Sequence, residues 1–211
     1  MPNQPFQLPR IYPITDSHLS GLTHAEQVRQ LIAGGAEIVQ IREKKASSAS
    51  FYDSVVLALK ASKDKGVHIV VNDRVDIAIA AGADGVHLGQ DDLSPELARK
   101  LLGSRKIIGY STHSVEQAQA AIELPVDYIA IGPIFPTSTK ENPDQVVGLK
   151  GIQEVRKAIG EFPLVAIGGI DMSNVISVFE AGATTAAIVS GLLSDPDLIS
   201  ERTSQILRMI G

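Results

Sequence analysis

Eight short apolar runs, rich in β-branched residues, recur along the chain of 211 residues and are separated by segments with helical periodicity. Most of each run is continuously apolar instead of alternating between apolar and polar residues. Continuous runs indicate strands that are buried on both faces, which is typical of parallel sheets. The predicted strands are residues 11–16, 37–44, 67–71, 85–89, 106–110, 127–132, 163–167 and 184–189.

Each predicted strand is followed by a segment with apolar residues at helix spacing. Two serines are candidate N-caps: Ser94, which precedes Pro95 at the first helical position, and Ser114. The predicted helices are residues 23–33, 47–65, 75–81, 114–122, 149–159, 175–181 and 196–210, together with the one that begins at Ser94.

Eight strand–helix units predict an α/β fold, a single closed (β/α)₈ TIM barrel of parallel strands, compact for a fold that usually takes about 250 residues. A doubly wound open sheet is the alternative. It is expected to place a glycine-rich phosphate turn after the first strand, and Asp16-Ser17-His18 is not such a turn. We expect one domain over residues 1–211, with a proline-rich lead-in at 1–10. The long irregular stretch 133–148 is of the kind that is usually functional in a compact domain.

Composition narrows the class of partner. A net charge of -5 argues against general binding to nucleic acid or to anionic membranes, so any basic site must be local. The chain has no cysteine, which excludes disulfides and thiolate zinc sites and fits a cytoplasmic protein. No segment approaches the roughly 18 consecutive apolar residues of a membrane helix. We therefore expect small-molecule substrates, and the sequence leaves a homo-oligomer open.

Polar residues collect at the carboxyl ends of the predicted strands, whereas the amino ends carry mostly a glycine followed by apolar residues. In a barrel the carboxyl ends meet at one mouth and carry the chemistry. The polar strand ends are Gln40/Arg42/Lys44, Asn72/Asp73, Gln90/Asp91/Asp92, Ser111/His113, Thr137/Thr139/Lys140, Gly168/Gly169 and Ser190/Gly191.

Cations come from two of these strand ends. Side chains alternate across a strand, so Gln40, Arg42 and Lys44 share one side. An arginine fork and lysine point charges suit a polyphosphate, and Lys140 adds a third cation. Each cation alone is more often a solvated surface charge; three together on a net-acidic chain favour an anion site.

Two carboxylates, Asp73 and Asp92, follow neighbouring strands. Mg²⁺ typically takes one or two carboxylates together with substrate phosphates, so this pair is a candidate metal site. The alternatives are a helix cap for Asp73 and a turn residue for Asp92, and Asp91 competes for the second position.

Glycines follow the last two strands, at Gly168-Gly169 and at Ser190-Gly191. Barrels commonly build a phosphate site there from backbone N–H groups. Tight turns are the simpler explanation of the glycines. No serine lies in a nucleophile-elbow pattern. His113 is either an acid/base or a loop donor, while His68 and His87 lie within strands and are expected to be structural.

Seven segments together resemble the thiamine-phosphate synthase family, in the same order and at the same strand ends. The segments are Gln40-Ile41-Arg42-Glu43-Lys44, Asn72-Asp73-Arg74, Gly85-Val86-His87-Leu88-Gly89-Gln90-Asp91-Asp92, Ile108-Gly109-Tyr110-Ser111-Thr112-His113, Gly132-Pro133-Ile134-Phe135-Pro136-Thr137-Ser138-Thr139-Lys140, Ala166-Ile167-Gly168-Gly169-Ile170 and Val189-Ser190.

The resemblance implies a Mg²⁺-dependent transferase of thiamine biosynthesis that joins an aminopyrimidine diphosphate to hydroxyethylthiazole phosphate by a dissociative alkyl transfer. It implies that Asp73 and Asp92 bind Mg²⁺. The residues implied to hold the pyrimidine diphosphate are Gln40, Ile41, Arg42, Glu43, Lys44, Asn72, Ser111 and Lys140. Those implied to act in catalysis are Arg42, Lys44, Lys140 and Ser111. Those implied to hold the thiazole phosphate are Thr137, Ser138, Thr139, Gly169, Val189 and Ser190.

Two other functions stay open at this point. A thiazole tautomerase of the same superfamily would use a histidine such as His113 for acid/base work but would leave Asp73, Asp92 and Lys140 without a task. A non-catalytic protein that binds thiamine phosphates would keep the phosphate glycines and would not need the carboxylates.

Overall fold

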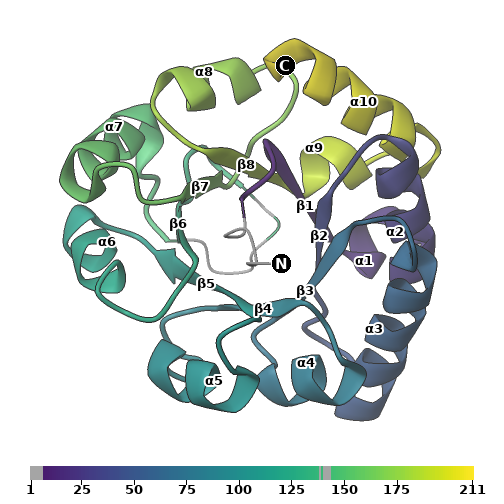
Figure 1. The fold of residues 1–211 in the computed structure, drawn as a ribbon. Helices are drawn as coiled ribbons and strands as arrows, with labels where there is room; N and C mark the ends of the chain where they lie inside the picture. The colour runs from purple at the N-terminus through teal and green to yellow at the C-terminus, as the bar shows by residue number, and fades with distance from the viewer. Residues whose placement is uncertain (1–6, 138, 140–143) are drawn as a thin grey trace.

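A computed structural model describes residues 7–137, 139 and 144–211. Eight parallel strands form a closed barrel in chain order, and β8 pairs with β1 (Figure 1). The predicted TIM barrel is therefore confirmed. The strands are β1 (Ile11–Thr15), β2 (Ile38–Ile41), β3 (His68–Asn72), β4 (Gly85–Leu88), β5 (Ile107–Thr112), β6 (Tyr128–Ile131), β7 (Leu164–Ile167) and β8 (Thr185–Ile188).

Helices surround the barrel as an outer ring (Figure 1). None of them, in the described part of the chain, has both the length and the apolar character that a membrane crossing requires. They are α1 (Ser17–Ser20), α2 (His24–Ala33), α3 (Ser48–Ser62), α4 (Val75–Ala81), α5 (Pro95–Leu102), α6 (Val115–Ala121), α7 (Gly148–Ile159), α8 (Val175–Glu180), α9 (Ser190–Leu193), the 3₁₀ turn η1 (Pro196–Leu198) and α10 (Ile199–Ile210).

Local sequence signals account for where several helices begin. The Ser94 side chain accepts from Leu97 N–H, and Ser114 accepts from Gln117 N–H, which confirms both predicted caps. Thr23 and Glu26 form a capping box at the start of α2. The predicted helix at 196–210 divides into η1 and α10, and α1 and α9 are two short helices that the sequence pattern did not predict.

The barrel interior holds its own apolar cluster, separate from the larger one between the strands and the helices. Tyr12 and Tyr128 are its largest members, and their rings meet edge to face at 5.8 Å. Gly109 makes this packing possible, because a Cβ there would lie 2.1 Å from Cζ of Tyr128. The tyrosines close the interior beneath the carboxyl ends of the strands.

Three residues just before even-numbered strands brace the amino end of the barrel in the same way. Asp84, Asp127 and Thr184 precede β4, β6 and β8, and each accepts the backbone N–H of a residue that begins or nearly begins the preceding strand. The three N–H groups belong to Ile69, Ile108 and Leu164. The contacts at the amino end of the barrel therefore serve stability, as expected for the fold.

Two arginines near the carboxyl ends of α5 and α7 extend the same pattern. Arg99 pairs with Asp127 at 2.8 Å, and Arg156 donates to Thr184 at 3.0 Å. Each guanidinium also donates to three backbone carbonyls near the amino end of the barrel. The acceptors are Gly103, Lys106 and Pro125 for Arg99, and Gly160, Phe162 and Gly182 for Arg156.

Candidate active site

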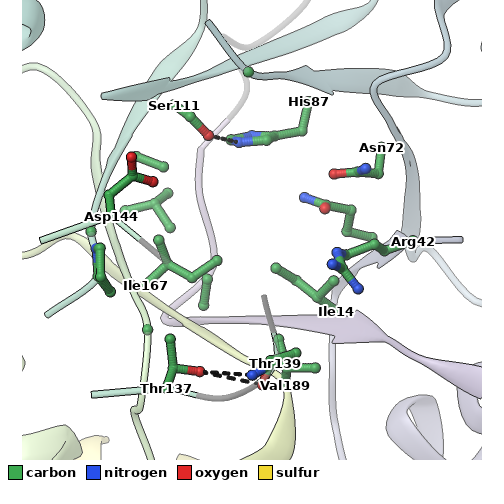
Figure 2. A pocket seen from close by; sticks show the side chains of 18 of the residues that line it. Ile14, Arg42, Asn72, His87, Ser111, Thr137, Thr139, Asp144, Ile167 and Val189 are labelled. Carbon is green, nitrogen blue, oxygen red and sulfur yellow. Dashed lines mark hydrogen bonds between the residues drawn. The ribbon is translucent and has the colours of Figure 1, made fainter. Parts of the chain in front are cut away.

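A cavity of about 550 Å³ opens at the carboxyl ends of the strands and is lined from all eight of them or from the loops that follow (Figure 2). The structure thus brings together, in one mouth, almost all of the predicted site residues that it describes. The predicted residues that line the cavity are Gln40, Arg42, Lys44, Asn72, Asp73, Gln90, Asp91, Asp92, Ser111, His113, Thr137, Thr139, Gly168, Gly169, Val189 and Ser190.

Some predicted residues are not placed there. Ser138 and Lys140 lie outside the described residues. Ile41 is fully buried in the core between the strands and the helices, and Glu43 faces α1 and α2. Neither lines the cavity, because alternate side chains of a strand point to opposite faces. Gly191 lies instead at a shallow neighbouring depression.

The cation side of the cavity is built on the segment after β2. Arg42 is 19% exposed and pairs with Asp16 at 3.2 Å, while Lys44 pairs with Asp73 at 2.5 Å. Asp16 also accepts from two backbone N–H groups at the start of α1. Sequence reasoning did not assign Asp16 this role, since its partnership with Arg42 exists only once β1 and β2 are paired.

The two carboxylates predicted as metal ligands are close enough to influence each other. Burial raises the pKa of Asp92 above its ordinary value, and the Asp73 charge raises it further, against the lowering effect of the Gly89 N–H that Asp92 accepts at 2.7 Å. The cap alternative for Asp73 is wrong, since Arg74 is the N-cap residue of α4 and Asp73 pairs with Lys44. Asp92 does close a turn with Gly89.

A buried hydrogen-bond chain forms the floor. Gln40 and Tyr128 both donate to the Tyr12 hydroxyl, at 3.2 and 2.9 Å, and His87 joins Tyr128 to Ser111 at 3.0 and 2.9 Å. Burial lowers the pKa of His87 to about 4, so the ring is neutral at pH 7. Because Tyr128 gives its proton to Tyr12, Nδ1 of His87 donates to Tyr128 and Nε2 accepts from Ser111. His87 is structural, as predicted, but it also lines the cavity.

Asn72 offers the cavity a donor. The side chain is 8% exposed, and its Nδ2 is buried with no hydrogen-bond partner among the described residues. Buried polar atoms nearly always have partners, so an orphaned donor at a cavity marks a place where another molecule accepts. Figure 2 shows Asn72 next to Arg42 on the same side of the cavity.

Hydroxyls and glycines form a different wall. Thr137, Thr139 and Val189 lie together on the side away from His87 and Ser111 (Figure 2), and Thr139 N–H donates to Thr137 Oγ1 at 3.3 Å. Gly168 and Gly169 have φ of 104° and 64°. A Cβ on Gly169 would lie 2.6 Å from the Pro136 carbonyl oxygen, so this wall requires a residue without a side chain.

His113 also lines the cavity, and a backbone contact defines its tautomer. Its Nδ1 lies 2.7 Å from the Gly132 carbonyl oxygen, which can only accept, so Nδ1 carries the proton. Nε2 is then the accepting nitrogen of the neutral ring. Asp144 Oδ2 is 3.6 Å from the same Nδ1, which orients the ring from a second side.

The chain is similar to known proteins over nearly its whole length. Residues 11–192 match the family model described as "Thiamine monophosphate synthase". A thiamine-phosphate synthase of Koribacter versatilis is 46% identical, covering 97% of both chains, and one of Persephonella marina is 46% identical, covering 93% of both. The structure of the Pyrococcus furiosus thiamine phosphate pyrophosphorylase has a TM-score of 0.85 at 32% identity, covering 95% of both chains. The chain therefore belongs to the thiamine-phosphate synthase family of enzymes.

Proposed function

We propose that this cavity joins 4-amino-2-methyl-5-(diphosphooxymethyl)pyrimidine to hydroxyethylthiazole phosphate, giving thiamine phosphate and pyrophosphate. One observation carries the proposal: a single cavity presents two chemically different walls for phosphate. Arg42, Lys44 and two carboxylates line one wall, and hydroxyls with side-chain-free backbone line the other. The names of the relatives support the same reaction.

The cation wall suits the diphosphate. Arg42 provides a planar donor fork and Lys44 a point charge, and the resemblance adds Lys140 as the third cation. Gln40, Asn72 and Ser111 lie at or next to the floor, where they address the pyrimidine ring. The buried Nδ2 of Asn72 obtains its missing acceptor when this half of the cavity is filled.

Asp73 and Asp92 fit a Mg²⁺ ion by the chemistry of their donors. The described residues contain no group of three or more histidine, aspartate or glutamate side chains arranged to hold a metal, so protein ligands alone do not make a closed site there. Mg²⁺ commonly completes its shell with substrate phosphates. Burial raises the pKa of Asp92 and the neighbouring Asp73 charge raises it further, and the repulsion between the two carboxylates favours the uptake of a cation. When bound, Mg²⁺ supplies positive charge to the departing diphosphate.

The glycine wall suits the monophosphate of the thiazole. Gly169 lets the Phe135-Pro136 segment pack closely against this wall, and Thr137, Thr139 and Ser190 supply hydroxyl donors beside it. The resemblance adds Ser138. Val189 gives this wall an apolar surface for the thiazole ring.

The reaction is a dissociative alkyl transfer. The bond between the pyrimidine methylene carbon and the diphosphate oxygen breaks, and the oxygen keeps the electron pair. The thiazole nitrogen then gives its lone pair to the methylene carbon, and the positive charge of the carbocation becomes that of the thiazolium ring. Arg42 and Lys44 stabilise the charge that develops on the leaving oxygen, and Ser111 holds the pyrimidine over the floor.

The test is the release of pyrophosphate by the purified chain. We expect release when both substrates and Mg²⁺ are present, and its loss when either substrate is omitted or EDTA is added. Isomerisation of the thiazole without pyrophosphate would replace the proposal with a tautomerase. Binding of thiamine phosphate with neither reaction would replace it with a sensor.

Asp73→Asn tests the carboxylates at almost constant shape. We expect kcat/KM to fall by about 100-fold or more, because the variant lacks one of the two negative charges that would hold Mg²⁺ beside the diphosphate. Asparagine tolerates the φ of 62° at this position, so the fold is retained. Asp76→Asn, in the exposed pair with Arg74, is the matched control and should leave kcat/KM within twofold. Full activity of Asp73→Asn would remove its assigned role, and the same comparison for Lys140→Ala would test Lys140.

A further inference from the structure

One buried histidine has no part in the cavity. His24 is the first residue of α2, is 4% exposed and lies on the opposite side of β2 from the ligand walls. Its Nδ1 lies 2.8 Å from Thr15 Oγ1, and its Nε2 lies 3.5 Å from Glu43 Oε2. Nε2 is buried and makes no hydrogen bond of normal length within the described residues.

Glu43 faces His24 as a carboxylate. It accepts from the Ser17 hydroxyl at 3.0 Å and from the Lys45 backbone N–H at 2.9 Å. Burial raises the pKa of Glu43, but these two donors and His24 lower it more, so the net pKa lies below the ordinary value. An anion next to an unprotonated ring nitrogen would place two lone pairs against each other. Nε2 of His24 therefore carries a proton toward Glu43.

Thr15 connects the other ring nitrogen to the same segment of chain. With Nδ1 of His24 unprotonated, the Thr15 hydroxyl donates its single proton to Nδ1, and its oxygen accepts the Arg42 backbone N–H at 3.3 Å. Thr15 is fully buried and belongs to β1. Both ends of the contact chain from Glu43 through His24 to Thr15 thus return to residues 42–43.

We infer that His24 is a positioning residue that holds the end of β2 from behind, through Glu43 and Thr15, and so directs Arg42 and Lys44 into the cavity. The inference rests on the proposed function only in naming a diphosphate as the ligand of those cations. The two attachment points are adjacent: Thr15 accepts the Arg42 backbone N–H, and His24 faces the Glu43 carboxylate. A loss of either contact therefore frees the backbone that carries the guanidinium.

The ionisable groups around His24 are few. Glu43 comes from the loop after β2, Asp16 from the end of β1 and His18 from α1. Burial lowers the pKa of His24, and His18 lowers it as well, whereas Glu43 and Asp16 raise it; the net pKa is below the ordinary value. At neutral pH the ring is therefore neutral, with its single proton on Nε2.

The decisive binding measurement compares two ligands on each variant. Inorganic pyrophosphate with Mg²⁺ probes the cation wall, and hydroxyethylthiazole phosphate probes the glycine wall, both by calorimetry. We expect His24→Phe to weaken pyrophosphate about tenfold and to leave the thiazole phosphate within twofold. Thr15→Val, which cuts the other attachment, should give the same pattern, and the exposed His68→Phe should change neither Kd. Unchanged pyrophosphate affinity, or equal loss of both ligands, overturns the inference.

A second measurement does not depend on the ligand. In spectra of the ¹⁵N-histidine-labelled chain we expect His24 to show a protonated Nε2 at pH 8, and an unprotonated Nε2 would overturn the relay. In the milder variant His24→Gln, the backbone amides of Arg42 and Lys44 should shift while those of Gly168 and Gly169 stay in place. If the unchanged chain fails to bind pyrophosphate, the proposed function fails, and these spectra still decide whether His24 positions the strand end.

Discussion

His87 occupies a position where a charge is costly. Its two nitrogens lie between the Tyr128 and Ser111 hydroxyls, and burial lowers its pKa to about 4 from an ordinary value of 6.5. The unfolded chain therefore binds one more proton than the folded chain between these two pH values. Stability from this residue is complete above about pH 6.5 and is lost as the pH falls toward 4.

We predict that the free energy of unfolding decreases by about 3 kcal/mol from this group over that pH interval, since each pKa unit corresponds to about 1.36 kcal/mol. His87→Gln should remove that part of the pH dependence, while His68→Gln, at an exposed position, should keep it. Urea titrations at pH 7, 5.5 and 4 measure the difference. Parallel pH profiles for His87→Gln and the unchanged chain would refute the assignment.

At this scale the sequence predicted which side chains gather, and it predicted few of the partnerships. Polar residues at the ends of buried strands share one mouth for geometric reasons, so Arg42, Asp73 and Ser111 could be identified before the fold was known. The pairing of Arg42 with Asp16, and the contact of His24 with Glu43, depend on strand register and on two short loops. No periodicity carries that information.

Among the elements, length decided which ones the sequence could predict. Helices of six or more residues show an apolar periodicity or a serine cap, and the predicted ones are present. The unpredicted helices α1 and α9 have four residues each, about one turn, which is too short for a repeat to be visible. Both follow the carboxyl end of a strand, and Ser190, the first residue of α9, lines the cavity.

Two elements, α5 and α7, are tied to the barrel by one arginine each. Arg99→Ala and Arg156→Ala should each lower the free energy of unfolding by about 2–3 kcal/mol, because hydrogen bonds from a charged group are each worth about 1.5–3 kcal/mol and several carbonyls lose their donor together. Lysine should recover little, since it lacks the planar fork.

Equilibrium urea unfolding measures these losses. The control is Arg74→Ala, whose partner Asp76 is 65% exposed, and we expect it to cost less than about 1 kcal/mol. If Arg99→Ala and Arg156→Ala lower the free energy of unfolding no more than Arg74→Ala does, the contacts of these two arginines do not stabilise the barrel. A loss in only one of them would show that the two contacts, although alike in geometry, are not equivalent.

For the whole molecule, a ligand that binds in the cavity should raise the free energy of unfolding. We predict that Mg²⁺ with inorganic pyrophosphate at 100 times its Kd raises the free energy of unfolding by about 2.7 kcal/mol, as expected for a ligand that binds the folded state alone. Thermal unfolding with and without EDTA measures this. Stabilisation by pyrophosphate that survives EDTA would show that the metal is not needed for binding. Cytoplasmic location and a homo-oligomer stay predictions from the sequence.

The pairing of β8 with β1 has a consequence for the synthesis of the chain. Ile11 lies opposite Ala186, so one edge of β1 has its hydrogen-bonding partner nearly 180 residues later in the sequence. Until residues 185–188 have left the ribosome, both outer strands of the growing sheet present unpaired backbone groups, which favour contacts with other chains. The barrel can therefore close only after nearly the whole chain has been synthesised. Substitutions in residues 185–188 that slow the pairing of β8 with β1 should reduce the soluble yield more than they reduce the stability of the folded barrel.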